Sequence, residues 1–478
     1  MAKFTRPSPA ASICCPEVTT TEDSEPEATP TVPVDLPERM TPTVLRLAGP
    51  MVVERLSISF LSAVDAILVG RYVGSDGVAS VGIAALLFWI PFAGAFGLDL
   101  ATTAVIARDY GAGTTDNLQR TLRMSLLIAF LWGAAATGLL WALAGPLMTM
   151  MAAEGDVHSF GVDYIRAASL GFPALMVLYA TSGALRGVGN TLLPMVIVLV
   201  LNAGNAIVSF LLISGVVGIE LEVLGSGIGY ATGSAIGGLL AAVVLLFGVG
   251  PMRYRPTRAL RTGRAEWDRL ANIGVPVGLE EVQFMAAFIV YSRVVTGLGS
   301  TAQAAHTIAL RTLELALVPG FSLGAAATSL VSRYLGARRP DLAERAALVG
   351  RAWAIGTMVT MGTLLAIFAP QFVSLFVDDE EVIDTGARLL RIFVIAFPFM
   401  GVHASLGGAL RGAGDARYVL GVLTVTAWGV RIPVALGLVL VGGFGAAGAW
   451  VGAATENIVR ALLIYRRFRQ GKWKEKVV

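Results

Sequence analysis

Residues 183–189 read Gly-Ala-Leu-Arg-Gly-Val-Gly, and residues 408–414 read Gly-Ala-Leu-Arg-Gly-Ala-Gly, 225 positions later (408 − 183). Three further pairs repeat in register: Phe172-Pro173 with Phe397-Pro398, Phe96-Gly97-Leu98 with Phe321-Ser322-Leu323, and Pro50-x-x-x-Glu54 with Pro276-x-x-x-Glu280. Their offsets are 225, 225 and 226 positions (397 − 172, 321 − 96 and 276 − 50). Four matches at nearly one spacing indicate an internal duplication that spans most of the chain.

The composition is that of a membrane protein. Of the 478 residues, 55% are hydrophobic and 14% are charged, whereas soluble domains are about 25% charged. A transmembrane helix needs roughly 20 mostly apolar residues. Twelve stretches meet this requirement: 43–70, 78–107, 121–145, 161–185, 192–214, 224–248, 268–296, 303–332, 346–370, 386–410, 418–441 and 445–466. The sequence therefore predicts an all-α polytopic membrane protein with twelve transmembrane helices.

Each repeat contains six predicted helices, and an even number leaves both repeats in the same orientation, as parallel repeats. We expect an N-lobe over residues 41–250 and a C-lobe over 268–466, with a cavity between them that opens alternately to either side of the membrane. A basic linker at 251–267 joins the lobes. Residues 1–40, rich in Pro, Thr, Glu and Ser, are expected to be a disordered tail, and residues 467–478 a basic tail.

The loop charges predict the orientation. Lys and Arg gather in the linker, after the eighth span and at the C-terminus: Arg253, Arg255, Arg258, Arg261, Arg264, Arg269, Arg333, Arg338, Arg339, Arg345, Arg466, Arg467, Arg469, Lys472, Lys474 and Lys476. The alternating loops 146–160, 215–223 and 371–387 carry acidic residues instead. Because positive loops stay inside, both termini are predicted to be cytoplasmic. The high Arg content suits the cytoplasmic (inner) membrane of a prokaryote.

These motifs resemble those of the multidrug and toxic compound extrusion (MATE) family. The doubled stretch at 183–190 and 408–415 resembles the signature after its fourth and tenth helices. Residues 304–311 (Ala-Ala-His-Thr-Ile-Ala-Leu-Arg) resemble the start of its eighth helix. Asp65 resembles a first-helix motif, and the archaeal, DinF-like branch is the most similar. The resemblance implies export of amphipathic, often cationic compounds, driven by influx of H⁺ or Na⁺.

Asp65 is the first candidate for ion coupling, because ionisable residues within a membrane helix are rare and often functional. A buried carboxylate can exchange a proton or bind Na⁺. Asn202, Asn205 and Ser209 lie on one helix face, at spacings i, i+3 and i+7, and Thr232 is on the next helix. The resemblance implies a polar cluster of these residues with Asp65, although Ser209 stands where the family usually has a second Asp. Polar contacts between helices are the alternative interpretation.

Two further acidic positions are candidates. Glu54 lies on the same helix face as Asp65, about 16 Å away along the axis, and either supplies the missing carboxylate or pairs with an Arg on another helix. Glu280 is favoured over Glu281 for a C-lobe cation site, which the resemblance implies in other branches. Structural roles are equally compatible with both sites.

Several charged residues have structural interpretations. Arg311 and Glu314 are expected to pair at i, i+3. Arg431 and Glu456, on the last two helices, are candidate partners. The arginines of the doubled motif, Arg186 and Arg411, are expected to fix the loops that follow them.

Aromatic and methionine side chains are candidates for substrate contact, since flexible Met surfaces suit varied ligands. They are Phe60, Met176, Tyr179, Phe284, Met285, Tyr291 and Met400. Ordinary packing explains the same spacing.

Other functions are disfavoured. The sequence has no Gly-x-x-x-x-Gly-Lys-[Ser/Thr] motif for a nucleotide, and its three histidines, His158, His306 and His403, have no metal-ligand spacing. We therefore expect a transporter rather than an enzyme, with no cofactor beyond the coupling ion. Its expected partners are small organic molecules and membrane lipid, without nucleic acid, and we expect a monomer. A flippase for a lipid-linked precursor is the alternative within the same superfamily.

Overall fold

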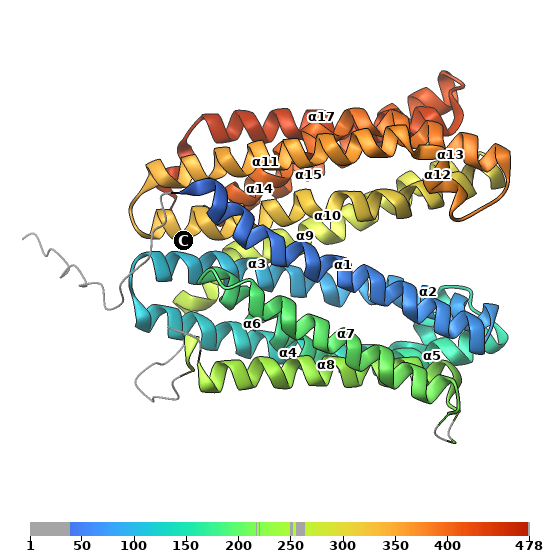
Figure 1. The fold of residues 1–478 in the computed structure, drawn as a ribbon, viewed down its shortest axis with the longest axis horizontal. Helices are drawn as coiled ribbons and strands as arrows, with labels where there is room; N and C mark the ends of the chain where they lie inside the picture. Colours follow the sequence, from blue (N-terminus) through green and yellow to red (C-terminus); the bar gives the residue numbers. More distant parts are fainter. Residues whose placement is uncertain (1–38, 217, 219, 249–251, 255–262, 477–478) are drawn as a thin grey trace, which may run out of the picture.

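The computed structural model describes residues 39–476, apart from 217, 219, 249–251 and 255–262. Residues 1–38 of the predicted tail lie outside the described residues, as does most of the basic linker. Within the described part of the chain the regular structure is helical. Figure 1 shows the long helices running side by side along one direction.

The first half contains eight helices. They are α1 (Met40–Tyr72), α2 (Ser75–Leu87), α3 (Trp89–Gly111), α4 (Thr115–Met150), α5 (Gly155–Ser169), α6 (Phe172–Gly187), α7 (Leu192–Ile213) and α8 (Glu222–Phe247).

The second half repeats this order with more breaks. It contains α9 (Arg264–Thr296), α10 (Ser300–Gly336), α11 (Pro340–Ile367), α12 (Ala369–Ser374), α13 (Glu380–Phe393), α14 (Phe397–Gly412), α15 (Ala416–Thr426), α16 (Ile432–Leu436) and α17 (Gly445–Arg469). A 3-10 turn at Val394–Ala396 joins α13 to α14, and π-helical turns at Ala427–Arg431 and Gly437–Val441 flank α16.

The twelve predicted spans correspond to these helices. Among the described residues, nine spans are long and apolar enough to cross a membrane, and α5 with α6 makes a tenth across a bend of 50°. The other two predicted spans are α1 and α17, which carry more charged residues than a typical span. The predicted second span is interrupted at Phe88, between α2 and α3.

Proline lies inside four of these helices, at Pro50, Pro146, Pro276 and Pro319. In water a proline in a helix interior removes a hydrogen bond and kinks or breaks the helix. Between packed membrane helices, neighbouring groups satisfy the freed carbonyls.

The two halves meet through exchanged contacts. Helix α3 of the first half packs against α9 of the second, and α1 of the first packs against α10 of the second. Since the duplication makes α9 the counterpart of α1 and α10 the counterpart of α3, these two contacts are related by the repeat. The structure thus has two six-span lobes with a pseudo-symmetric interface.

Glycine makes the closest approach across this interface possible. Gly111 of α3 and Gly336 of α10 are repeat equivalents (336 − 111 = 225). A Cβ atom on Gly111 would overlap the carbonyl of Arg333, and a Cβ on Gly336 would overlap the carbonyl of Arg108. Helices α3 and α10 therefore cross with their backbones in contact.

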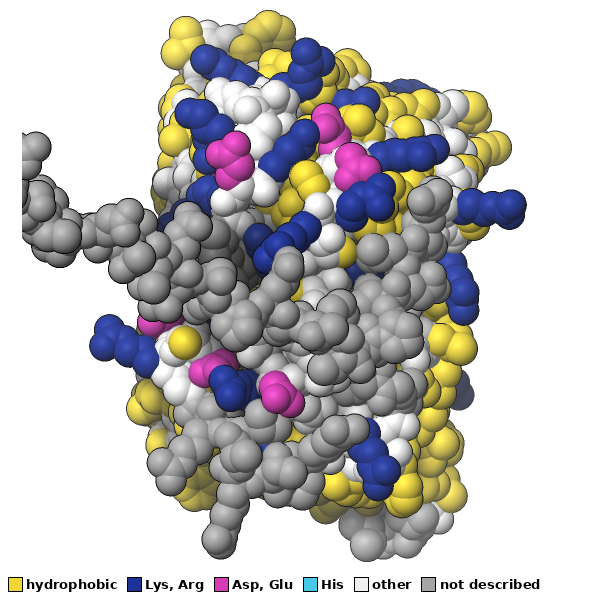
Figure 2. All heavy atoms as spheres, turned by 90° about the vertical axis from the view of Figure 1, so that its left-hand side faces the viewer, with side chains coloured by type: hydrophobic (Ala, Val, Ile, Leu, Met, Phe, Trp, Pro, Cys, Tyr) yellow, Lys and Arg dark blue, Asp and Glu magenta, His cyan; other side chains and the backbone are white. Residues whose placement is uncertain are grey.

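The lobes meet at one end of the molecule. There the start of α1, around Val44, joins the apolar core of the C-lobe, and Ala101 and Val105 of α3 pack against Ile273 of α9. At the opposite end, the main contacts of α2 and α5 are with N-lobe helices, and those of α12 and α13 are with C-lobe helices. Figure 2 views the meeting end, where Lys and Arg are the most frequent charged side chains.

Candidate functional site

Asp65 lies in a polar cluster between α1 and α7. Its side chain is buried beside Asn205, and the Ser209 hydroxyl donates a hydrogen bond to Asn205 Oδ1 at 2.9 Å. Asp65 Oδ1 and Asn205 Nδ2 are both buried, and neither makes a hydrogen bond of standard geometry with a described residue, although the two side chains lie close together. Buried polar groups are normally satisfied, so this arrangement has the capacity to bind a proton or another small ligand.

Two glycines of α8 allow this helix to lie directly against the cluster. A Cβ on Gly229 would overlap the Ser209 hydroxyl, and one on Gly233 would overlap the side chain of Asn205. Thr232, on the same helix, is half-buried and makes no hydrogen bond to another described residue. The structure therefore brings Asp65 together with Asn205 and Ser209, and not with the Thr232 hydroxyl.

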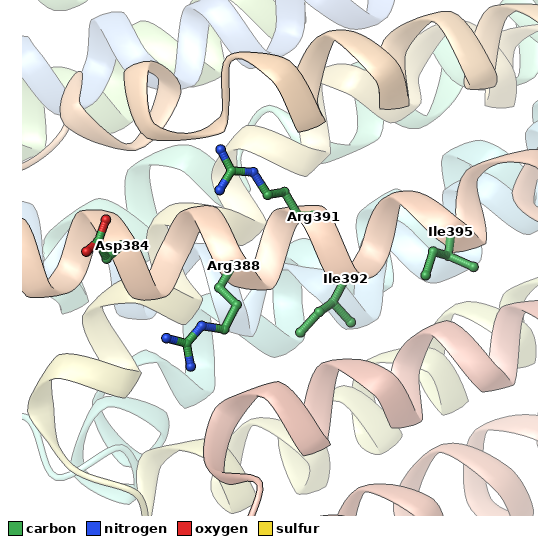
Figure 3. A pocket seen from close by; sticks show the side chains of 5 residues that line it. All are labelled: Asp384, Arg388, Arg391, Ile392 and Ile395. Carbon is green, nitrogen blue, oxygen red and sulfur yellow. The ribbon is translucent and has the colours of Figure 1, made fainter.

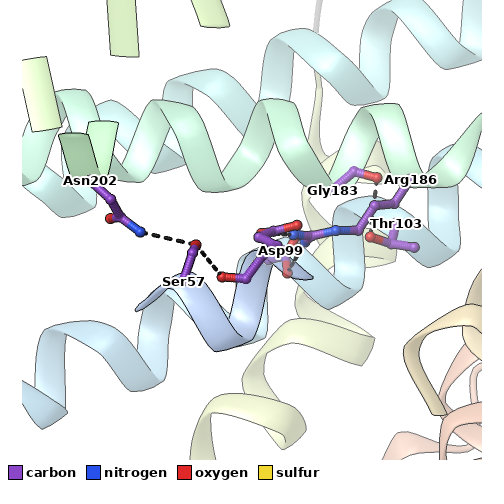
Figure 4. A network of polar contacts seen from close by, with 7 residues as sticks. Ser57, Asp99, Thr103, Gly183, Arg186 and Asn202 are labelled. Carbon is purple, nitrogen blue, oxygen red and sulfur yellow. Dashed lines mark hydrogen bonds and ion pairs between the residues drawn. The ribbon is translucent and has the colours of Figure 1, made fainter. Parts of the chain in front are cut away.

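Asn202 belongs to a different chain of contacts. Its amide donates to the Ser57 hydroxyl at 3.0 Å, and Ser57 donates to the main-chain oxygen of Glu54 at 2.7 Å. Figure 4 shows this chain running along α1 toward Asp99 and Arg186. The predicted face of α7 is thus divided between an Asp65 cluster and a second cluster near Glu54.

The second cluster centres on Arg186 of the doubled motif. Its guanidinium donates to Glu54 of α1 at 2.5 Å and to both carboxylate oxygens of Asp99 of α3, at 2.8 and 2.7 Å. Thr103 of α3 donates to the carbonyl of Gly183, at 3.1 Å, and holds the motif in place (Figure 4).

The C-lobe repeats this geometry with one carboxylate fewer. Arg411 donates two hydrogen bonds to Glu280 Oε2, at 3.1 and 2.6 Å. Thr328 donates to the carbonyl of Gly408 at 2.9 Å, as Thr103 does to Gly183. In both lobes, therefore, the Glu of the Pro-x-x-x-Glu motif binds the Arg of the doubled motif.

These contacts bear on three predictions. Arg186 and Arg411 do not fix the loops that follow them, because both guanidinium groups reach into the lobe and bind glutamates. The alternative for Glu54, a pairing with an Arg on another helix, is confirmed. Glu280, favoured for a cation site, forms an ion pair with Arg411, whereas the Glu281 carboxylate makes no ion pair with a described residue, and the cation site stays a prediction.

Two predicted ion pairs are confirmed. Arg431 binds Glu456 at 2.5 Å, and Arg460 also bonds to Glu456. Arg311 and Glu314 lie 3.7 Å apart with both side chains exposed.

The side chains predicted to contact substrate differ in their exposure. Phe60 is 71% exposed, whereas Met176 and Met400 are buried in the cores of their own lobes and so offer no surface to a ligand in this conformation. Tyr179 is half-buried and makes edge contacts with Phe92 and Phe96.

In the C-lobe, Arg431 covers two of the other candidates. Its guanidinium lies 5.6 Å from the ring centre of Phe284 and 5.5 Å from that of Tyr291. Tyr291 is buried, and Met285 is half-buried on the same helix. Phe284 and Tyr291 are thus tied to the Arg431–Glu456 ion pair.

The MatE family model matches residues 50–211 and, a second time, residues 276–436. The chain belongs to the MatE family. The two matched stretches begin 226 positions apart (276 − 50), which is the offset of the duplicated Pro-x-x-x-Glu motif. The twelve-helix, two-repeat layout is that of the MATE fold, so the chain is a multi-pass membrane transporter and not an enzyme.

Relatives and solved structures agree with this assignment. The multidrug resistance protein PmpM of Pseudomonas aeruginosa is 31% identical over 445 residues, which cover 89% of this chain and 92% of that protein. A probable multidrug resistance protein, NorM of Thermotoga maritima, is 24% identical, with 93% and 96% covered. A solved outward-facing multidrug resistance MATE transporter superposes with a TM-score of 0.85 at 21% identity, covering 91% of this chain and 96% of that one.

One surface hollow of this MATE chain lies away from both clusters. It has a volume of about 460 Å³ and is lined by Asp384, Arg388, Arg391, Ile392 and Ile395. Figure 3 shows that these side chains come from one continuous stretch that begins on α13. The hollow is therefore an outer face of the C-lobe and not a space between the lobes.

Asp99 is the site residue that the sequence reasoning missed. It follows the duplicated Phe-Gly-Leu stretch, and an ionisable residue inside an apolar span was the signal that could have identified it. Its counterpart in the second repeat is Gly324 (324 − 99 = 225). A comparison of the two repeats therefore does not identify Asp99.

Proposed function

We propose that this MATE transporter is a secondary active multidrug exporter, which moves amphipathic, cationic organic compounds out of the cell in exchange for inward movement of H⁺. The names of its relatives support the substrate class, since PmpM is a multidrug resistance protein. The two lobes contact each other mainly at one end of the molecule, and this arrangement supports alternating access.

The observation that carries the coupling proposal is the buried carboxylate of Asp65. It has an oxygen that makes no hydrogen bond of standard geometry with a described residue, and it lies on α1, a helix that also packs against the C-lobe. A change in its charge alters the cost of burying it, and α1 transmits the resulting shift to the other lobe. H⁺ is favoured over Na⁺ because the first-helix motif around Asp65 resembles that of the proton-coupled branch of the family.

We propose that the basic end in Figure 2 faces the cytoplasm, in agreement with the positive-inside rule. A flippase for a lipid-linked precursor is less well supported, because Arg186, Arg411 and Arg431 are all engaged by carboxylates. They are not free to bind a diphosphate.

Ethidium efflux from proteoliposomes tests this function, under an imposed pH gradient and then under an imposed Na⁺ gradient. We expect efflux with the pH gradient alone, and its loss in Asp65→Asn to about the level of empty liposomes. Efflux that requires Na⁺ and survives Asp65→Asn would assign coupling to another site. The exposed Asp116→Asn on α4 is the matched control.

A further inference from the structure

Arg186 connects the two main N-lobe helices of the interface between the lobes. Its guanidinium binds Glu54 on α1 and Asp99 on α3, and its main-chain oxygen accepts a hydrogen bond from Ser329 of α10 at 2.7 Å. Helix α1 packs on α10, and α3 packs on α9. The side-chain contacts of Arg186 therefore set how the two interface helices lie relative to one another.

The N-lobe cluster contains one carboxylate more than its counterpart. In the C-lobe, Arg411 makes an ion pair with Glu280 only, while Glu281 acts on it from a longer distance, and Gly324 takes the place of Asp99. A Cβ on Gly324 would lie 2.5 Å from the carbonyl of Ala404, so the closeness of α10 and α14 excludes an acidic side chain there. An acid that joins the arginine to the central interface helix is thus specific to the N-lobe.

Two carboxylates share a single guanidinium in this cluster. Glu54 is 5% exposed, and its Oε2 has no hydrogen-bond partner among the described residues. Two ionised carboxylates at one buried site repel each other, and a proton on either one would relieve this repulsion.

Two other polar groups face the pair. Arg55 of α1 acts on Asp99, but its side chain makes no ion pair with a described residue. Tyr179 of α6 lies close enough to interact with both carboxylates and is a neutral phenol. Neither group makes an ion pair with Glu54 or Asp99 in the described structure.

We infer that Glu54 and Asp99 form a second proton site of the N-lobe, separate from Asp65, at which uptake of one proton releases Arg186 from one interface helix. This inference rests on the proposed proton coupling and extends it. The proton binds to a carboxylate oxygen, and Arg186 stays with the carboxylate that remains charged. Loss of the proton restores the three-residue bridge and the packing of α1 and α3 against the C-lobe.

Infrared difference spectroscopy of the purified full-length protein, between acid and mildly alkaline pH, tests this site without substrate. We expect a carbonyl band from a protonated, buried carboxyl group, still present in Asp65→Asn and reduced by at least about half in both Glu54→Gln and Asp99→Asn, because the two share one proton. Asp116→Asn, on the exposed face of α4, is the control and should leave the band unchanged.

Two results would overturn the inference: a band that keeps its wild-type intensity in Glu54→Gln and in Asp99→Asn, or a wild-type protein with no such band. Only variants that elute as a single species on size-exclusion chromatography are compared, and the two substitutions lie on different helices, so misfolding of one leaves the other informative. A normal band without ethidium efflux under either gradient would refute the proposed function and not the site.

Discussion

Asp415 illustrates how single residues fasten the meeting end of the lobes. It lies in the turn between α14 and α15, outside the membrane-spanning segments, and accepts hydrogen bonds from Arg467 at 2.7 Å and from Lys476 at 2.6 Å. Burial by itself would raise the pKa of Asp415, but the hydrogen bonds and charges of Arg467 and Lys476 outweigh it and lower this pKa. Lys476 also accepts a hydrogen bond from Arg108 of α3 through its main-chain oxygen, at 2.6 Å.

Asp415→Asn should lower the free energy of unfolding by about 1 to 3 kcal/mol at neutral pH, because two charged donors lose an ionised acceptor. A carboxylate whose pKa is lowered by folding stabilises the protein above its unfolded pKa of about 3.9, and this contribution is lost as the pH falls through the lowered pKa. Thermal unfolding in detergent at several pH values would show the difference between wild type and variant. A difference that grows on acidification would contradict the assignment.

At the residue scale, the sequence predicts which groups matter better than it predicts their partners. The repeat identifies Glu54, Arg186, Glu280 and Arg411 because each motif occurs twice. Their pairing depends on how α6 packs against α1, and α14 against α9, which are contacts across more than a hundred residues that no local spacing encodes. The Arg431–Glu456 pair is easier to predict, since few charges exist on the last helices.

At the scale of helices, the crossing of α3 and α10 fixes how closely the lobes approach. Gly336→Ala places a methyl group against the carbonyl of Arg108, so one backbone must move. Such overpacking costs about 1 to 3 kcal/mol, and we expect the variant to unfold at a lower temperature than wild type.

The matched control for this variant is Gly356→Ala on α11, an exposed helical position where an added Cβ meets no other atom within 4 Å. There the change should leave stability unchanged or raise it by about 0.4 to 1 kcal/mol, because alanine has less freedom in the unfolded chain. Equal melting temperatures for Gly336→Ala and Gly356→Ala would show that the crossing is looser than the structure indicates.

Helix positions are predictable from apolar length, and helix breaks are less so. All twelve predicted spans correspond to helical segments, because hydropathy over roughly 20 residues depends little on neighbours. The interruption at Phe88 and the bend between α5 and α6 were not predicted, since both depend on packing of the short helices α2 and α5 against each other. The π-helical turns around α16 likewise have no signal in the apolar pattern.

For the whole molecule, the duplication alone predicts two lobes in the same orientation. It does not predict the end of the molecule at which the lobes meet. Hydrophobic patterning marks a buried face without stating whether lipid or the other lobe covers it. The structure resolves this through inter-lobe pairs such as Arg269 of α9 with Asp109 of α3, whose charged atoms lie 2.5 Å apart. These residues offer a place to restrain the lobes at the basic end.

If transport requires this end to open, joining the lobes there must stop it. In a protein whose Cys14 and Cys15 are replaced by Ser, Asp109→Cys and Arg269→Cys would be linked by a short, cleavable, thiol-reactive reagent. We expect the linked protein to lose ethidium efflux in proteoliposomes and to regain it on reduction, because the lobes rock about their interface during each cycle. Each single-cysteine protein, treated in the same way, shows what loss of the ion pair alone does. Undiminished efflux in the linked protein would mean that substrate crosses without separation of α3 from α9, and alternating access between these lobes would have to be abandoned.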